Sequence, residues 1–442
     1  MTNRTAAEIA FSQDGSCATR ACAPKRLPIV SAGNMATVDS AQMRVQNSSL
    51  VLRLVWSEEL ISRAEVSRRT GLSRSTVSDI VGALLEGRMI SEFGAGDSVG
   101  GRRPILLRVN EDAFAQIGID IGASHVGVGL MNPYGQIKAW RERRHPAHTD
   151  PHGTFEVIDE LIETVLVEAD LPQRQVLGLG VAVPSPVHPR DPGLLSEVTM
   201  PAWAGRDIRN QLGQTYGVPV FVDNDANLGA LAELWWGAGR DGSDLVYVKV
   251  GTGVGAGFII NGDIYRGSAG FAGEIGHVVI DPSSDRQLRG LRGCLAAFVG
   301  AEALERRAAE RLGGAGQPEG TPCTVSNIAQ AALHGDPIAR AIVEEAGRYL
   351  GIAVVNLLNL TNPATVVLGG PITRTGEIIL RPIHETVRAH TLWRDVASSR
   401  VVTSELGERA IAIGAATQVL KAALDTPSMF PRIQVRRKGS PV

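Results

Sequence analysis

The sequence predicts an α/β protein of several domains, in which a small helix-turn-helix domain precedes a larger domain of two lobes. The first observation is that two closely joined helical segments, near residues 62–87, each begin with a capping residue. The second is a repeat, because a strand, a glycine-containing turn and a second strand near residue 121 recur about 129 residues later. Such a duplication predicts two similar lobes that face each other across a cleft.

Composition limits the class of protein. The chain has 442 residues, of which 44% are apolar, and this is enough for two or three domains with real cores. Its net charge of −2 means that any contact with nucleic acid must come from a local patch. Four cysteines are too few for a disulfide framework in a chain of this size, and no apolar run approaches the length of a membrane span. We therefore expect a cytoplasmic protein that is neither exported nor inserted in a membrane.

The patterns divide the chain into four parts. Residues 1–45 are small and polar without sustained periodicity, and we expect a flexible N-terminal tail. Residues 46–112 are expected to form a winged helix-turn-helix domain, and residues 113–425 the two-lobed domain. Residues 426–442 are Pro-rich and basic, which is typical of a solvated C-terminal tail.

The helix-turn-helix prediction depends on the capping residues. Ser62 and Glu65 fit a capping box, and Gly71 lies where the helix can end with a residue in the left-handed backbone conformation. Only one residue then separates Gly71 from Ser73, which can cap the next helix. Two helices joined this closely are typical of a helix-turn-helix motif.

The second of these helices has the features of a recognition helix. The first turns of such a helix reach base edges in the major groove. After it, a Gly-rich tip between two extended segments resembles a wing that offers cations to phosphates. The predicted DNA contacts are Ser73, Arg74, Ser75, Thr76 and Ser78 in the helix, with Arg102 and Arg103 in the wing. The alternative is a helical bundle with a solvated loop, since residues 45–110 hold only nine Arg against seven acidic residues.

Three polar residues end the apolar run near residues 218–222. Asp223, Asn224 and Asp225 lie where a strand gives way to a helix. Two carboxylates and an amide at this place suit the binding of sugar hydroxyls, or the removal of a proton from one. The alternative is that Asp223 or Asn224 only caps the following helix.

The two Gly-rich turns also leave two interpretations open. Residues 121–124 and 250–253 can cradle an anion with backbone N–H groups, or can be plain hairpins. The second turn does not fit the dinucleotide fingerprint, because it precedes the strand-like segment Phe258–Ile260 and not a helix.

Five spaced motifs together resemble the ROK family of repressors, open reading frames and kinases. They are DIGAS at Asp120–Ser124, NDAN at Asn224–Asn227, GTGVGAG at Gly251–Gly257, GEIGH at Gly273–His277 and VVLGG at Val366–Gly370. The resemblance implies an actin-like, ribonuclease H-like domain of the sugar-kinase type. The N-terminal winged helix with its GRRP segment is similar to the regulator branch of this family.

The resemblance also implies roles for single residues. Asp225 matches the family's catalytic base, and the implied sugar ligands are Asn224, Asp225, Glu274 and His277. Ser185 replaces the usual Gly of the sugar-side loop, where it can narrow the pocket or add a hydrogen bond. Nucleotide phosphates and magnesium in kinase members would lie near Asp120, Gly122, Thr252 and Gly253, and the adenosine near Gly369 and Gly370. Trp203 matches an aromatic residue near the sugar, although core packing explains it equally well.

Two departures from the family pattern carry predictions. Family members hold zinc with a histidine and a C-x-C-G-x-x-G-C run, but here Gln287 and Arg289 replace two of the three thiolates. Four N or S ligands are needed for a structural zinc site. We therefore expect no metal, a packing or ion-pair role for this loop, and a buried Cys294. The first phosphate loop has Ala123, Ser124 and His125 in place of Gly-Thr-Lys, which should weaken phosphate binding.

These features predict a DNA-binding transcriptional regulator, a repressor of carbohydrate genes whose ROK-like domain senses a sugar. Its partners would be operator DNA, a sugar effector and a second copy of the chain, as a homodimer or tetramer. The alternative is an active ATP-dependent sugar kinase with a DNA-binding head, which alone would need ATP and magnesium. A third hypothesis is a regulator controlled by a protein that docks on the sugar domain.

Overall fold

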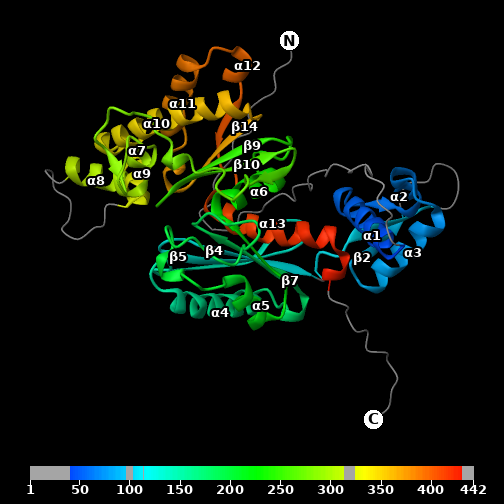
Figure 1. Cartoon of the computed structure of the whole chain (residues 1–442). Helices are drawn as coiled ribbons and strands as arrows, with labels where there is room; N and C mark the ends of the chain where they lie inside the picture. The colour runs from blue at the N-terminus through cyan, green and yellow to red at the C-terminus, as the bar shows by residue number, and fades with distance from the viewer. Residues whose placement is uncertain (1–39, 96–102, 113, 313–323, 431–442) are drawn as a thin grey trace.

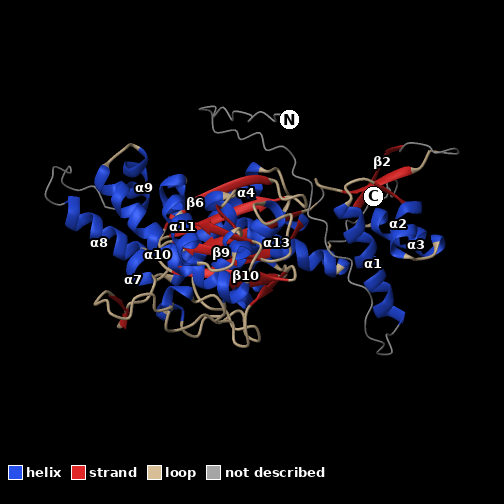
Figure 2. Cartoon of the chain, turned by 90° about the horizontal axis from the view of Figure 1, so that it is seen from above, coloured by secondary structure: helices blue, strands red, loops and turns tan. Residues whose placement is uncertain are grey.

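The region predicted to be a winged helix-turn-helix lies at one end of the molecule, as Figures 1 and 2 show. The structure is a computed structural model that describes residues 40–95, 103–112, 114–312 and 324–430. The elements of this part are α1 (Ser40–Ser57), β1 (Ile61–Ser62), α2 (Arg63–Thr70), α3 (Arg74–Glu86), β2 (Ile90–Ala95) and β3 (Ile105–Val109). The strands form one antiparallel sheet in the order β1-β3-β2. Three helices and this sheet make a winged helix.

The caps of α2 and α3 follow the sequence prediction with one difference. The backbone N–H of Glu65 donates to Ser62 Oγ at 3.2 Å, and that of Thr76 donates to Ser73 Oγ at 3.1 Å. Gly71 ends α2 with a φ of 72°, which a side chain would disfavour. The Glu65 carboxylate pairs with Arg68 on the next turn. Only the Ser62 half of the predicted capping box is therefore seen.

The two lobes have sheets of the same topology, which confirms the duplication. The N-terminal sheet has the order β6-β5-β4-β7-β8, and the C-terminal sheet has the order β11-β10-β9-β14-β15. In each, the first three strands form an antiparallel meander and the last two are parallel. The strands of the N-terminal sheet are β4 (Ala115–Ile121), β5 (His125–Met131), β6 (Ile137–Arg144), β7 (Val176–Val183) and β8 (Val220–Asn224). Those of the C-terminal sheet are β9 (Leu245–Val250), β10 (Val254–Ile260), β11 (Asp263–Tyr265), β14 (Thr365–Gly369) and β15 (Arg400–Thr403).

Helices cover the outer faces of both sheets (Figure 1). The N-terminal sheet carries α4 (Pro151–Glu168) and α5 (Ile208–Tyr216). The C-terminal lobe carries α8 (Ala301–Leu312), α9 (Val325–Leu333), α10 (Pro337–Thr361) and α11 (Glu377–His390). Asp336 caps α10 and Pro337 is its first residue, a combination that favours the start of a helix. In the part of the chain that is described, no helix combines the length and apolarity needed to cross a bilayer.

Two helices, α6 (Asp225–Trp236) and α13 (Ala410–Asp425), pack against each other between the sheets. α13 lies on β4 and β7 of the N-terminal sheet, and α6 lies on β9 and β10 of the C-terminal sheet. Their crossing is so close that a Cβ on Gly414 would lie 1.8 Å from the carbonyl oxygen of Leu228. Every residue of α6 is buried, so this helix is packed along its whole length in the core shared by the two lobes.

A cluster of tryptophans joins the winged helix to this core. Trp56, in α1, is fully buried and donates its indole N–H to the carbonyl of Pro133 at 2.7 Å. Its ring centroid lies 5.2 Å from that of Trp235 and 6.1 Å from that of Trp236, at the end of α6. Ser49 Oγ also donates to the carbonyl of Asp425 at the end of α13, at 2.7 Å. The winged helix thus contacts the ends of both central helices.

The described residues extend into both segments that the sequence predicts as tails. Helix α1 begins at Ser40, although residues 40–45 were expected to belong to the flexible tail. Met43, Arg44, Val45 and Gln46 are exposed, so they show no apolar periodicity that would mark a helix. At the other end, Phe430 is buried with its ring centroid 5.1 Å from that of Phe114. The segment that follows α13 is therefore packed as far as residue 430.

Candidate functional site

The start of α6 forms the centre of the candidate site, and Asn224 caps this helix. Asn224 Oδ1 accepts from the backbone N–H of Ala226 at 2.9 Å and from that of Asn227 at 3.3 Å. Its Nδ2 donates to the carbonyl of Ser185 at 3.2 Å. Capping and ligand binding are compatible here, because one amide hydrogen stays available for a sugar hydroxyl.

Asp223 links the two lobes through an ion pair with Arg266. Its side chain is nearly inaccessible, and Oδ2 accepts from Arg266 Nε at 2.9 Å. Oδ1 accepts from Asn227 Nδ2 at 3.0 Å and from the backbone N–H of Asn224 at 2.8 Å. Arg266 follows β11 of the C-terminal sheet, so this ion pair ties the end of β8 to the other lobe. Sequence reasoning missed Arg266, because no local pattern separates it from other surface arginines.

Asp225, the candidate base, is ion-paired with Lys249. The pair joins the first residue of α6 to the penultimate residue of β9. Burial acts to lower the pKa of Lys249, but the carboxylates of Asp225 and Asp120 outweigh it, so the pKa is raised and the side chain is a cation. Sequence reasoning missed Lys249, although a single lysine in the apolar strand LVYVKV was a signal.

Glu274 and His277 form a second polar pair of the candidate site. The turn η3 (Ile275–His277) places His277 Nε2 at 3.7 Å from Glu274 Oε2. Burial raises the pKa of Glu274, the charge of Asp225 raises it further, and His277 opposes both. Glu274 is thus within electrostatic reach of Asp225, as expected if both carboxylates face one ligand. His277 is half exposed and can meet a ligand from solvent.

Ser185 and Trp203 have structural roles. The Ser185 hydroxyl is buried and engaged within its own loop, with Thr199 Oγ1 at 2.8 Å and the backbone N–H of Ser196 at 3.3 Å. Its predicted contact with sugar would require this loop to rearrange, so we do not assign Ser185 as a ligand. Trp203 is fully buried and donates its indole N–H to the carbonyl of Ala147 at 2.8 Å. It belongs to the core, which was the alternative for this residue.

The residues predicted to contact nucleotide lie at three places: the first Gly-rich turn, the second Gly-rich turn and the end of β14. Asp120 is buried at the end of β4, and its Oδ2 lies 3.4 Å from His125 Nε2. The ring of His125 covers Gly122, where a Cβ would lie 2.1 Å from the imidazole. Thr252 and Gly253 are exposed in the turn between β9 and β10. Gly369 ends β14. Gly370 follows it with a φ of 106°, and a Cβ there would lie 1.9 Å from the carbonyl oxygen of Val250.

The loop that replaces the family's zinc motif is held by ion pairs. It forms a short hairpin of β12 (Gln287–Leu288) and β13 (Leu291–Arg292). Arg286 lies 3.3 Å from Glu345 and stacks over Phe298, which is the predicted ion-pair role. Arg289 Nη1 reaches the carbonyl of Val198, at 3.4 Å, and Cys294 is buried as predicted. Among the described residues, no three His, Cys, Asp or Glu side chains gather as metal ligands.

The predicted DNA-contacting residues are displayed at the start of α3. Ser73, Arg74, Ser75 and Ser78 are exposed, and Thr76 is partly buried. Ser73 Oγ lies 2.9 Å from Ser75 Oγ and 2.8 Å from Thr76 Oγ1, so these hydroxyls form one group. Arg103 is exposed before β3. Arg102 lies outside the described residues.

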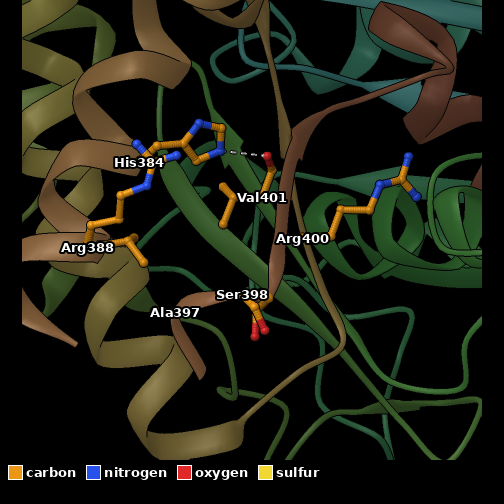
Figure 3. A pocket seen from close by; sticks show the side chains of 8 residues that line it. His384, Arg388, Ala397, Ser398, Arg400 and Val401 are labelled. Carbon is orange, nitrogen blue, oxygen red and sulfur yellow. Dashed lines mark hydrogen bonds between the residues drawn. The ribbon is translucent and has the colours of Figure 1, made fainter. Parts of the chain in front are cut away.

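A separate hollow of about 360 Å³ lies between α11 and β15 (Figure 3). His384 Nε2 faces the carbonyl of Val401 there at 3.0 Å. Arg400 is directed away from His384 and donates to the carbonyl of Ala238 at 2.9 Å. None of the predicted functional residues lines this hollow, so we do not assign it to the site.

The comparisons with known proteins agree with this arrangement. The sequence pattern that defines the ROK family matches residues 116–422. The chain belongs to the ROK family. It is 32% identical to the xylose repressor of Caldicellulosiruptor bescii over 390 residues, which are 86% of this chain and 97% of that protein.

Solved structures of ROK regulators and ROK kinases match different shares of this chain. A ROK family transcriptional regulator, a homolog of the E. coli MLC protein, superimposes with a TM-score of 0.72 at 26% identity, over 87% of this chain and 97% of its own. A ROK family glucokinase from Streptomyces griseus, in complex with glucose and AMPPNP, gives a TM-score of 0.62 at 27% identity. The glucokinase match covers 98% of that chain but only 69% of this one. The regulator thus matches a larger share of the chain.

Proposed function

We propose that this protein is a DNA-binding transcriptional repressor whose two-lobed domain senses a sugar. The winged helix supplies the DNA-binding surface at the start of α3, with Arg74 and the neighbouring hydroxyls exposed. The residues predicted to line the cleft, Asn224, Asp225, Glu274 and His277, supply acceptors and donors for sugar hydroxyls. The relative named xylose repressor makes D-xylose the first sugar to test.

One observation carries this proposal: a single helix connects the two surfaces. Helix α6 begins with the cleft residue Asp225 and ends with Trp235 and Trp236, which contact Trp56 of the DNA-binding domain. Its 12 residues span about 18 Å. Because α6 is buried along its whole length, a displacement at its first turn is transmitted to its last turn and not absorbed locally.

The sugar would act by favouring one of two arrangements of the lobes. A ligand shifts such an equilibrium only by its difference in affinity for the two states. Asp225 follows β8 of the N-terminal sheet, and Glu274 lies after β11 of the C-terminal sheet. A sugar between them would therefore make more hydroxyl contacts when the cleft is closed than when it is open. Closure would then tilt α6 and change how the winged helix is held. We infer that the protein acts in the cytoplasm as a homodimer, because one recognition helix reads too few bases for a specific operator.

The competing hypothesis is a sugar kinase with a DNA-binding head. Asp225 is present as a candidate base, but it is already ion-paired with Lys249. The chain also has the histidine ring of His125 over its first phosphate loop. Both contacts favour ligand sensing over phosphoryl transfer.

The test is a gel shift run beside an ADP-release assay on the full-length protein. Fragments of the DNA upstream of its own gene are titrated at fixed salt, with D-xylose, D-glucose or N-acetyl-D-glucosamine added. We expect one sugar to release the DNA without ADP formation. Asp225→Asn should weaken the sugar response through lost hydroxyl contacts and leave binding to DNA without sugar unchanged. Rapid ADP formation on a sugar, lost in Asp225→Asn, together with no retarded fragment, would favour the kinase.

A further inference from the structure

Lys249 is the residue of the cleft that the proposed function does not explain. It stands in β9 between apolar neighbours, and its side chain is only 18% exposed, while that of its partner Asp225 is 8% exposed. A buried lysine is rare, because removing its charge from water is costly unless a carboxylate compensates. Here Asp225 Oδ2 accepts directly from the ammonium. Asp120 is the second carboxylate whose charge acts on Lys249.

Asp120 shows why a cation is needed at this place. It lies at the end of β4 in the N-terminal sheet with 3% of its surface exposed. Its Oδ2 faces His125, but its Oδ1 is buried without a hydrogen-bond partner among the described residues. The ammonium of Lys249 comes from the C-terminal sheet and supplies positive charge to this carboxylate and to Asp225. The three side chains therefore form one charge cluster across the lobes.

A magnesium–nucleotide complex, which the kinase branch of the family implies, does not fit this cluster. Magnesium needs carboxylate and water oxygens around it in near-octahedral geometry. The ammonium of Lys249 already lies on Asp225 and would repel a divalent ion held between Asp225 and Asp120. In addition, the ring of His125 lies over Gly122, where the backbone would otherwise approach a phosphate.

The charges of the cleft also favour an uncharged ligand. Lys249 is paired with Asp225, and Arg266 is paired with Asp223. Each of these cations is thus committed to a carboxylate, and Glu274 adds a further acidic side chain beside Asp225. A phosphate group brought into this cleft would meet carboxylates without an uncommitted Lys or Arg among these residues. An uncharged sugar can donate its hydroxyls to the same carboxylates.

We propose that Lys249 is a built-in counter-cation that takes the place of the divalent ion, closes the cleft to magnesium–nucleotide and makes it selective for an unphosphorylated sugar. This inference rests on the proposed sugar-sensing function and names the chemical class of its ligand. Lys249 acts through Asp225 and Asp120, so it is a positioning residue.

The experiment compares four full-length proteins: wild type, Lys249→Met, Lys249→Arg and Lys421→Met. Lys249→Met keeps the length of the side chain but removes its charge, and Lys249→Arg keeps the charge. Lys421→Met is the matched control, because Lys421 pairs with Asp263 at the surface away from the cleft. Melting temperature is measured against MgCl₂ and EDTA. Binding of Mg·ATP, D-xylose, D-glucose and D-glucose 6-phosphate is measured by calorimetry.

We expect wild type, Lys249→Arg and Lys421→Met to be indifferent to magnesium and EDTA, and to bind no Mg·ATP. In Lys249→Met the two carboxylates lose their cation, so magnesium should raise its melting temperature and any sugar binding should become dependent on magnesium. An unphosphorylated sugar should bind wild type at least about tenfold more tightly than D-glucose 6-phosphate. A tenfold difference corresponds to about 1.4 kcal/mol of binding free energy.

Three results would overturn the inference. They are tight binding of Mg·ATP by wild type, tighter binding of D-glucose 6-phosphate than of D-glucose or D-xylose, and a Lys249→Met protein that ignores magnesium. If Lys249→Met does not fold, the magnesium and nucleotide titrations of wild type and Lys249→Arg still decide the question. Failure of the proposed function is distinguishable, because it would appear in the gel shift as absent DNA binding and not in the magnesium titrations.

Discussion

Replacing Trp56 tests whether α6 carries the sugar signal to the DNA-binding domain. Trp56 is fully buried, packs against Trp235 and Trp236, and donates to the carbonyl of Pro133. Truncation of a buried tryptophan to alanine costs about 3–5 kcal/mol. The free energy that couples two sites in a protein is about 1–3 kcal/mol, or about 5- to 150-fold in affinity. The loss at this contact therefore exceeds the coupling that it is proposed to transmit.

We expect Trp56→Ala to bind sugar within about twofold of wild type, because Trp56 lies about 18 Å from the cleft end of α6. In wild type, sugar should change the affinity for DNA by about 5- to 150-fold, and in Trp56→Ala this change should fall to less than about twofold. The assay is fluorescence anisotropy of a labelled upstream fragment, with and without the sugar that releases it from wild type. Thermal unfolding shows whether the variant is folded. Trp56→Phe, which keeps a ring but loses the indole donor, should respond to an intermediate degree.

Trp203 provides the matched control. It is also fully buried, and it also donates its indole N–H to a backbone carbonyl. It lies, however, in the core of the N-terminal lobe, in one cluster with Val187 and Leu195 of the loop that holds Ser185. Trp203→Ala should weaken sugar binding and leave the affinity for DNA without sugar unchanged. The reasoning would be refuted if Trp56→Ala kept a full sugar response, or if both variants lost DNA affinity equally.

Three further predictions concern other parts of the molecule. Ser73→Ala removes the cap of the recognition helix, so it should destabilise the winged helix by about 1 kcal/mol. It should also weaken DNA binding. Unchanged denaturation curves and DNA titrations would contradict this prediction. Gly414→Ala forces a Cβ against the backbone of α6 and should lower stability by at least about 1–3 kcal/mol, whereas Gly213→Ala, which meets nothing closer than 3.9 Å, should be tolerated in the same melting experiment. Burial raises the pKa of Glu233 above its usual 4.5, so its contribution to stability is present below pH 4.5 and is lost as the pH rises through the raised value. Glu233→Gln should therefore gain melting temperature relative to wild type as the pH rises, and a difference independent of pH would count against this assignment.

The winged helix could be predicted because its determinants are local. Ser62, Gly71 and Ser73 act within one turn of their own positions, and the structure has them as caps. The repeat of strand and turn was visible because both copies keep the same order of apolar residues. The start of α1 was missed, since the exposed residues after Ser40 give no periodic signal.

The candidate site could be predicted only in part. Asp225, Glu274 and His277 belong to motifs, and the structure places Glu274 Oε2 at 3.7 Å from His277 Nε2 and within electrostatic reach of Asp225. Lys249 and Arg266 belong to no motif, and their importance comes from carboxylates 24 and 43 residues away. Ser185 matched a position in the family pattern, but its hydroxyl is turned into its own loop by Thr199 and Ser196.

The sequence by itself determined the order of the parts, the type of those helices and strands that carry caps, turns or apolar periodicity, and the polar residues at the start of α6, because these signals act over a few residues. Only the tertiary structure decided which charges face each other and which surfaces are connected. The Lys249–Asp225 pair and the contact of Trp56 with Trp235 each join residues from separate elements. Such pairs depend on how sheets and helices pack in space, and no spacing along the chain encodes them.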